Sequence, residues 1–184
     1  MEKIKILGIS GSLRKDSLNT KLLKCSGKAL PENIEFDIAD ISGVPIYSED
    51  VEALSAPQSV KDLEEKIQSA DALIIATPEY NYSIPGVLKN TIDWLSRSEV
   101  LKHKIIAIMG ASPGMLGTIR AQLHLRESLL FMRAKIFSEK EFYFSHANNR
   151  LDESGDLTDE NDKKFMKDFI DGFVDFIKVN KQSI

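Results

Sequence analysis

The sequence predicts an α/β fold in which helices cover both faces of a central parallel sheet. Short β-branched segments alternate along the chain with longer segments of helical period, which is the order of elements in such folds. Apolar segments such as ALIIA and IIAIM are continuous, so their strands are expected to be buried on both faces. Five strand-and-helix units allow a doubly wound sheet, whose ligands bind outside the carboxyl ends of the strands.

The five strands are expected at apolar segments, the last of which is weak: residues 4–9, 34–38, 72–76, 105–109 and part of 135–144. Helices are expected where apolar residues recur three or four apart, at residues 17–30, 57–69, 86–96, 118–132 and 159–180. In the last helix a stripe recurs every four residues, and we interpret it as a face that docks on the sheet rather than a ligand groove: Phe165, Phe169, Phe173 and Ile177.

Length and composition fit one domain spanning residues 1–184. The chain has 42% hydrophobic and 28% charged residues, and a domain of this size buries roughly 70% of its unfolded surface without needing a disulfide or a metal. The one cysteine, Cys25, has no internal partner, and the start MEKIKILGIS lacks the apolar run of a signal peptide. We therefore expect a cytoplasmic protein that neither spans a membrane nor, at a net charge of -4, binds nucleic acid.

The loop after the first strand has the composition of an anion site. Residues 8–19 are rich in small and hydroxyl side chains and lead into a helix, whose free N–H groups attract negative charge. Arg14 adds a charged fork that matches phosphate oxygens, and Gly11 permits close backbone approach. The loop lacks the lysine of a P-loop and the three spaced glycines of a dinucleotide turn, so a monophosphate ester fits better. The alternative is that Ser17 only caps the helix and the other serines form a solvated turn.

The loops after the third and fourth strands are expected at the same edge of the sheet. In TPEYNYSIPG, residues 77–86, two prolines stiffen a loop that carries Tyr80 and Tyr82, side chains suited to covering a planar heterocycle. Backbone amides at 79–81 are candidates to bond the polar edge of such a ring, although an ordinary strand-to-helix connector remains the alternative. The segment 110–118, GASPGMLGT, is again rich in glycine and again precedes a helix.

Three segments together resemble the NADPH-dependent FMN reductase family: GSLRKDSLN, TPEYNYSIPGVLKNTIDWLSR and ASPGMLGTIRAQLHLR. The family is a flavodoxin-like group that contains quinone, chromate and azo-dye reductases, and the resemblance covers about residues 3–145. It implies a five-stranded parallel sheet in the order 2-1-3-4-5, FMN as the cofactor and NADPH or NADH as the co-substrate. Hydride would pass through the flavin to quinones, azo or nitro compounds, chromate or free flavin. Because the cofactor carries this chemistry, no catalytic side chain is expected.

The resemblance also implies which residues bind the cofactor. In the family the first loop holds the FMN phosphate, the second lies along the isoalloxazine ring and the third supplies the other side. Carried over to this chain, the first set is Ser10, Ser12, Arg14, Ser17 and Asn19, the second is Pro78, Glu79, Tyr80 and Asn81, and the third is Ser112, Gly114 and Gly117. The pair Gly117-Thr118 departs from the paired glycines that relatives commonly have, which concerns the local backbone contact and not the cofactor.

Two other classes of protein remain as alternatives. An electron-carrier flavodoxin is disfavoured because such carriers typically have a threonine-rich, uncharged phosphate loop, whereas this loop contains Arg14 and Asn19. A non-catalytic flavin-binding or nucleotide-binding module shares the fold, and the fold by itself does not exclude it.

The remaining polar residues suggest no second chemistry. The histidines share no metal-ligand spacing with one another or with Cys25, so no metal site is expected: His103, His124 and His146. Cys25 is interpreted as core packing, because it lies in the first helix rather than in the phosphate loop. Glu79 has no neighbours that would tune it as an acid or base, so a positioning or interface role is expected.

A homodimer, or a dimer of dimers, is expected with the flavin near the subunit boundary. The helix at 118–132 has two apolar sides, one with Ile119, Leu123 and Leu130 and the other with Leu125, Leu129 and Met132. That is more apolar surface than one sheet face covers, and Trp94 on the preceding helix is of a type enriched at interface centres. Family relatives pair through these same two helices. The alternative is that the C-terminal helix covers the second apolar side.

Overall fold

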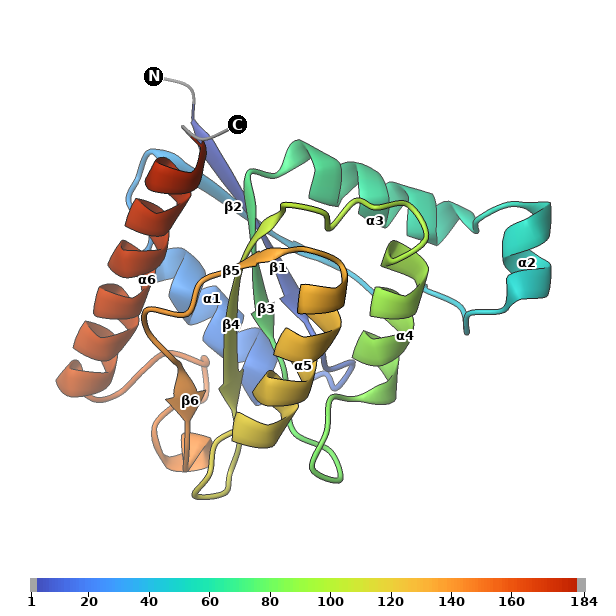
Figure 1. Ribbon diagram of the computed structural model, residues 1–184. Helices are drawn as coiled ribbons and strands as arrows, with labels where there is room; N and C mark the ends of the chain where they lie inside the picture. Colours follow the sequence, from blue (N-terminus) through green and yellow to red (C-terminus); the bar gives the residue numbers. More distant parts are fainter. Residues whose placement is uncertain (1–2, 182–184) are drawn as a thin grey trace.

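A parallel sheet forms the middle layer of the molecule, and helices pack on both of its faces (Figure 1). The computed structural model describes residues 3–181. The strands run in the order β2-β1-β3-β4-β5, as the family resemblance implies, and β6 also pairs with β4. Their bounds are β1 Ile4–Ser10, β2 Ile34–Ala39, β3 Ala72–Ala76, β4 Ile105–Ala111, β5 Lys135–Ile136 and β6 Tyr143–Phe144.

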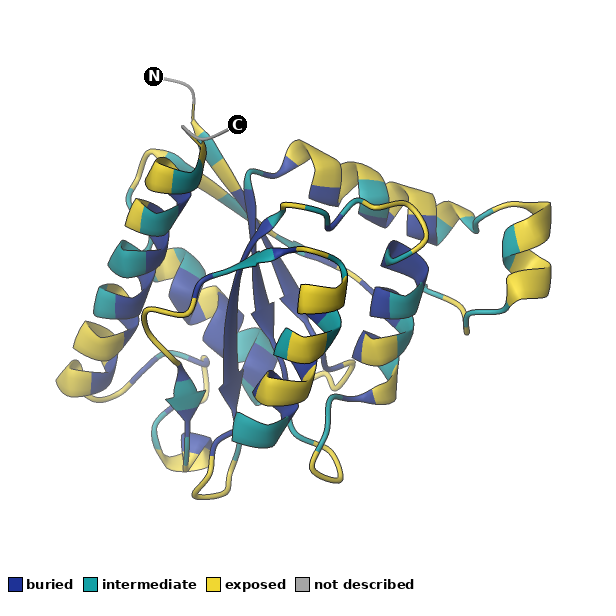
Figure 2. Ribbon diagram, in the orientation of Figure 1, coloured by how far each residue is buried: buried dark blue, intermediate teal, exposed yellow. Residues whose placement is uncertain are grey.

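The helices divide between the two faces according to the alternation of side chains along the strands. Ile74 and Ala107 point toward α1 (Leu18–Ala29) and α6 (Glu160–Lys181). Their neighbours Ile75 and Ile106 point toward α3 (Gln58–Ser69), α4 (Gly86–Leu95) and α5 (Ile119–Phe131). Every residue of β3 and β4 is buried, and Figure 2 shows these strands as the dark centre of the molecule. The predicted two-sided burial is therefore confirmed.

The weak fifth strand is divided into two short pieces. Lys135 and Ile136 pair with Ile105 and Ile106 at the start of β4, whereas β6 pairs with Gly110 and Ala111 at its end. Between the two pieces the chain leaves the strand path, and Phe137 turns into the core against Phe169 and Phe173 of α6. The apolar residues of this segment thus serve two different contacts, which explains the weak strand pattern.

One helix was not expected from the sequence. The helix α2 (Glu49–Leu54) lies beyond β2, and its first turn contains Glu49, Asp50 and Glu52, which suit a helix N-terminus. None of its residues is buried, so it has no apolar stripe by which a sequence pattern would reveal it. In Figure 1 it stands at the end of the molecule next to α3 and α4.

The aromatic stripe of α6 docks on the sheet as predicted. Phe169, Phe173 and Ile177 are buried with α1 and β4 in the same core. Phe165 is half-exposed and stacks on Phe142, with the ring centres 4.7 Å apart. No ligand groove is needed to explain this stripe.

The two apolar sides of α5 have different surroundings. Leu125 and Leu129 are buried in the core, whereas Leu123 and Leu130 remain 49% and 62% exposed. The alternative that α6 covers the second side is wrong, because α6 lies on the opposite face of the sheet.

The expectation that Trp94 lies at an interface is also wrong. Its ring is only 1% exposed and its Nε1 donates to the Pro45 carbonyl oxygen at 2.8 Å.

Gly110, near the end of β4, is predicted to be irreplaceable. A Cβ there would lie 1.9 Å from Thr118 Oγ1 and 2.5 Å from the Thr77 carbonyl oxygen, and the second atom belongs to the backbone. Gly110→Ala should therefore lower the free energy of unfolding by about 2 to 3 kcal/mol, measured as a shift in the urea midpoint.

Gly86→Ala is the matched control for this substitution. A Cβ on Gly86 meets no atom of the described chain within 4 Å, and the residue begins α4. The variant should be neutral or more stable by up to about 1 kcal/mol. Equal urea midpoints for the two variants would contradict the close packing of Gly110.

Candidate functional site

Three loops meet at the carboxyl edge of the sheet, where the strand order reverses between β1 and β3. They follow β1, β3 and β4, and together they line a cavity of about 80 Å³. Such a crevice is where doubly wound folds bind their ligands. The cavity brings together eight of the residues proposed from sequence: Ser12, Arg14, Ser17, Asn19, Pro78, Glu79, Tyr80 and Ser112. Four others lie in or beside the same loops but do not line it: Ser10, Asn81, Gly114 and Gly117.

The start of α1 has the donors of an anion site. Ser17 is the N-cap, and its Oγ accepts from the Thr20 N–H at 3.3 Å, while its carbonyl oxygen accepts from Lys21 N–H. The N–H groups of Leu18 and Asn19 have no partner within the helix, because no turn precedes them. The capping bond uses a lone pair of Ser17 and leaves its hydroxyl proton available. Capping and anion binding are therefore compatible at this residue.

Two residues of the first set are committed to the protein itself. Ser10 Oγ lies 2.8 Å from Thr20 Oγ1. The Asn19 side chain donates to the Ala111 carbonyl oxygen at 3.0 Å and accepts from the Ala111 N–H at 2.9 Å. Asn19 is buried, and this paired contact fixes the first turn of α1 to the end of β4. Its side chain thus positions the site, while its backbone N–H stays directed out of the helix start.

The loop after β3 ends in a tight two-residue turn. Tyr80 N–H and Ser83 N–H each donate to the other residue's carbonyl oxygen, at 2.9 and 3.0 Å. Asn81 and Tyr82 between them have φ of 51° and 63°, as a type I′ turn requires. A bulky residue at positive φ is strained, and such strain concentrates at functional sites. The turn holds the Tyr80 and Tyr82 side chains exposed at the ligand edge.

Glu79 holds this loop against α5. Its Oε2 accepts from the backbone N–H groups of Arg120 and Ala121 at 3.0 and 3.3 Å, and its Oε1 accepts from Arg120 Nη1 at 3.0 Å. The carboxylate therefore caps a helix from a loop about 40 residues earlier, where negative charge is favoured. This agrees with the expected positioning role. The carboxylate is committed to α5, so only the backbone of Glu79 remains to meet a cofactor.

Sequence reasoning missed two basic residues of α5 that support the same loop. The Arg120 guanidinium lies 4.0 Å from the centre of the Tyr82 ring, a cation–π contact. One turn later His124 Nδ1 lies 3.0 Å from Ser83 Oγ. Their spacing of four places both on one face of the helix, but nothing in the sequence shows that a loop about 40 residues away meets that face.

In the loop after β4, local packing explains why Gly117 is a glycine and why the next residue, Thr118, need not be one. Gly117 has φ of +60°, and a Cβ there would lie 3.0 Å from the Tyr143 backbone. Thr118 has φ of −133°, which any residue adopts, so its position requires no glycine. Its Oγ1 accepts from Gln122 Nε2 at 3.1 Å and packs against Gly110. Threonine at position 118 is therefore compatible with this loop.

Cys25 lies outside this site. Its Sγ donates to the Gly155 carbonyl oxygen at 3.1 Å, and burial raises the pKa of the thiol, so it stays protonated. This agrees with core packing.

Within residues 3–181, no group of three or more His, Cys, Asp or Glu side chains is placed to hold a metal ion. No helix among these residues is long and apolar enough to cross a membrane.

The sheet order and the helices on both faces define a flavodoxin-like fold, and the cavity lies at the edge where such folds bind their ligands. Residues 4–149 match the family model for NADPH-dependent FMN reductase, and the chain belongs to this family.

Relatives over nearly the whole chain agree. The NAD(P)H-dependent FMN reductase of Pseudomonas aeruginosa is 46% identical over 90% of this chain and 91% of its own length. The 2-hydroxy-1,4-benzoquinone reductase of a Burkholderia species is 37% identical over 95% and 97%. Among solved structures, FerB of Paracoccus denitrificans, a flavoenzyme NAD(P)H:(acceptor) oxidoreductase, aligns with a TM-score of 0.89 and 38% identity over 96% and 98%.

The chain is therefore an oxidoreductase with FMN as cofactor and NAD(P)H as co-substrate. The electron-carrier and non-catalytic alternatives are not supported. The residues present fit FMN, because the edge of the sheet combines unpartnered helix N–H groups, hydroxyl donors and a guanidinium with an exposed aromatic loop.

Arg14→Ala should weaken FMN binding by about 1.5 to 3 kcal/mol, the contribution of a hydrogen bond to a charged group. Arg14 is exposed and lines the cavity, so its loss should leave the urea midpoint unchanged. The FMN dissociation constant is measured by quenching of flavin fluorescence. Lys15→Ala is the control, because Lys15 is an exposed neighbour of the same charge that does not line the cavity. Equal dissociation constants for the two variants would remove Arg14 from the phosphate seat.

Proposed function

We propose that this chain is a quinone reductase whose flavin phosphate sits at the start of α1 and whose flavin ring lies between the loops after β3 and β4. The observation that carries the proposal is the cavity in which Ser12, Arg14 and Ser17 adjoin Pro78, Tyr80 and Ser112. The phosphate would be held by the hydroxyls of Ser12 and Ser17, the Arg14 guanidinium and the N–H groups of Leu18 and Asn19.

The bound flavin supplies two-electron hydride chemistry, and the protein supplies binding and orientation. The type I′ turn keeps the side chains of Tyr80 and Tyr82 exposed, and Tyr80 lines the cavity, so this turn would cover one side of a flat ring. Glu79 and Arg120 hold that turn in place, so the aromatic wall is rigid before any ligand arrives. Backbone amides of the two loops are then the donors for the polar edge of the ring.

A flat, aromatic acceptor suits this wall. Tyr80 and Tyr82 are exposed and offer apolar faces with polar tips, which match a quinone ring and its carbonyl oxygens. The name of the Burkholderia relative, a benzoquinone reductase, supports the same acceptor class. Nicotinamide and quinone would use the same open face in turn, so the kinetics are expected to be of the ping-pong type.

We also propose that residues 1–184 act as one domain in the cytoplasm. Both hydrophobic cores share the same sheet, which supports a single unit. Reduced nicotinamide is a cytoplasmic metabolite, and the one thiol of the chain has no internal partner.

The activity is tested with the purified protein and a choice of flavins. The protein should bind FMN more tightly than FAD, because the seat offers donors for one phosphate ester and the first loop lacks a dinucleotide fingerprint. With FMN bound, NADPH or NADH should be oxidised rapidly when 1,4-benzoquinone is added, giving parallel lines in double-reciprocal plots. Preference for FAD, or no acceleration by quinone while FMN is bound, would refute the proposal.

The assembly is proposed to be a homodimer, or a dimer of dimers, that pairs through α5. Leu123 and Leu130 are spaced seven residues apart on α5, so they share one face of the helix, and both are exposed, so they form an apolar stripe. Phe131 at the end of α5 and Leu116 in the turn before it are also exposed. An exposed apolar stripe of this kind is typical of a protein interface. Because α5 begins at the site loops, a partner on this stripe would lie close to the flavin.

Leu130→Glu should split this assembly, since a charge would be buried in an apolar interface. Light scattering should give a mass near 20.6 kDa for the variant and a multiple of it for the unaltered chain. Leu54→Glu is the control, because Leu54 is exposed on α2, away from the stripe. Leu125→Glu is unsuitable, because Leu125 is buried in the core of its own chain. A 20.6 kDa mass for the unaltered chain at all concentrations would exclude the dimer.

A further inference from the structure

The loop after β4 is held from behind by a separate segment of chain, residues 142–147. Gly110 N–H donates to the Phe142 carbonyl oxygen and Ser112 N–H to that of Phe144, at 3.1 and 3.0 Å. In two further bonds the segment is the donor and the loop is the acceptor. Ala147 N–H donates to the Ser112 carbonyl oxygen at 3.0 Å, and His146 N–H donates to that of Gly114 at 3.1 Å. The peptide groups on the flavin side of this loop are therefore oriented by bonds made on its other side.

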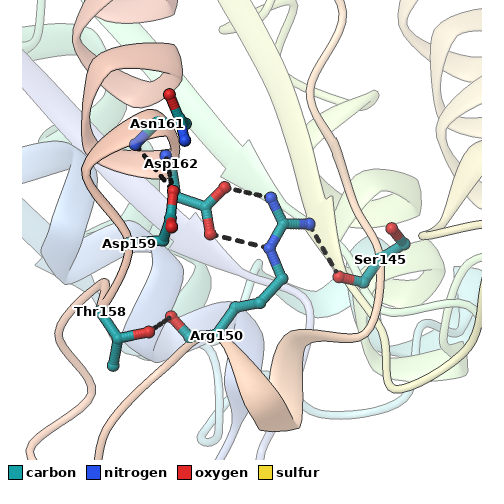
Figure 3. A network of polar contacts seen from close by, with 6 residues as sticks. All are labelled: Ser145, Arg150, Thr158, Asp159, Asn161 and Asp162. Carbon is teal, nitrogen blue, oxygen red and sulfur yellow. Dashed lines mark hydrogen bonds and ion pairs between the residues drawn. The ribbon is translucent and has the colours of Figure 1, made fainter.

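One guanidinium holds this segment (Figure 3). Arg150 binds both carboxylate oxygens of Asp162, in the first turn of α6, with Nε to Oδ2 at 2.8 Å. Its Nη1 donates to the Ser145 carbonyl oxygen at 3.0 Å, and its carbon Cζ lies 4.1 Å from the centre of the Phe144 ring. Thr158 donates through N–H and Oγ1 to the Arg150 carbonyl oxygen. Arg150 thus joins α6 to both sides of the turn at His146.

The turn needs this support. His146 has φ of 49°, a left-handed conformation that persists in a residue other than glycine only when its surroundings impose it. The His146 ring is exposed, so its contribution here is the backbone N–H that binds Gly114. Asp162 is only 6% exposed, and its hydrogen bonds raise the pKa of Arg150, so the guanidinium stays charged. Removing the partner of a buried carboxylate strongly destabilises a protein. Among basic side chains, only arginine offers a planar fork of two donors for the carboxylate.

We infer that Arg150 and Asp162 form a positioning pair for the flavin site. Through His146 and Ala147 the pair sets the orientation of the Ser112 to Gly117 loop, and so the binding and electronic environment of the flavin. Neither side chain is among those that line the cavity, so they act on it only through the backbone bonds. The inference rests on the proposed placement of the flavin ring beside this loop.

Asp162→Asn tests the pair in the full-length protein. The amide keeps the shape of the carboxylate but not its charge. At a temperature well below unfolding, FMN should bind about tenfold more weakly, a typical coupling through such a network. With FMN saturating, the visible circular dichroism and the midpoint potential of the flavin should shift. The amides of His146 and Ala147 should exchange hydrogen faster.

Asp71→Asn is the matched control. Like Asp162, Asp71 is a carboxylate paired with a cation, Lys181 at 2.6 Å; it accepts in addition the Lys5 backbone N–H at 2.7 Å, and it lies at the opposite end of the sheet. It should leave the flavin signals unchanged even if it lowers stability. Arg150→Lys keeps the charge without the fork and should show the same flavin changes as Asp162→Asn. If Asp162→Asn fails to fold, the same measurements on Arg150→Lys test the pair.

Arg14→Ala separates failure of the inference from failure of the proposed site. If Arg14→Ala leaves FMN affinity unchanged, the placement of the flavin is wrong. If Arg14→Ala weakens binding while folded Asp162→Asn and Arg150→Lys retain the FMN affinity, dichroism and potential of the unaltered protein, the positioning pair is refuted. Equal flavin changes in Asp71→Asn would refute it as well, because the effect would then follow stability rather than the loop.

Discussion

Burial of β3 and β4 on both faces is the constraint on which the rest of this structure depends. Because every residue of these strands is covered, helices must pack on both sides, and each crossover must run in the sense that returns the chain to a parallel neighbour. The strands consequently end at one edge, and the loops after β1, β3 and β4 converge there. The order and direction of the strands therefore place the cleft at this edge, whichever side chains line it.

Polar pairs then fix the loops at that edge to one another. Asn19 joins the start of α1 to β4, Glu79 joins the loop after β3 to α5, and Arg150 joins the segment behind the third loop to α6. Each pair is buried or half-buried, where an unpaired polar group costs free energy, so each specifies one arrangement of its two segments. These contacts are made without a ligand, so the loops are positioned in advance, which favours the defined orientation that hydride transfer needs.

The chain is an oxidoreductase whose redox chemistry is that of its FMN cofactor. At the edge of the sheet it combines hydroxyls, a guanidinium and an exposed aromatic loop, which we propose bind and orient that cofactor. Tyr80 and Tyr82 are exposed on that loop and are suited to contact a flat acceptor. The helix α5, which carries the exposed Leu123 and Leu130, begins at the same loops, so the proposed assembly is expected to lie near the cleft.

Sequence by itself determined the sheet, its two helical layers and the composition of the three loops, because strand and helix periodicity and helix-start chemistry are local properties. Only the tertiary structure showed that Asn19 is committed to Ala111, 92 residues away, and that Glu79 caps α5. It also divided the fifth strand, buried Trp94 and paired Arg150 with Asp162. A side chain whose partner lies on another element leaves no periodic pattern, so its role is decided only when packing brings the two segments together.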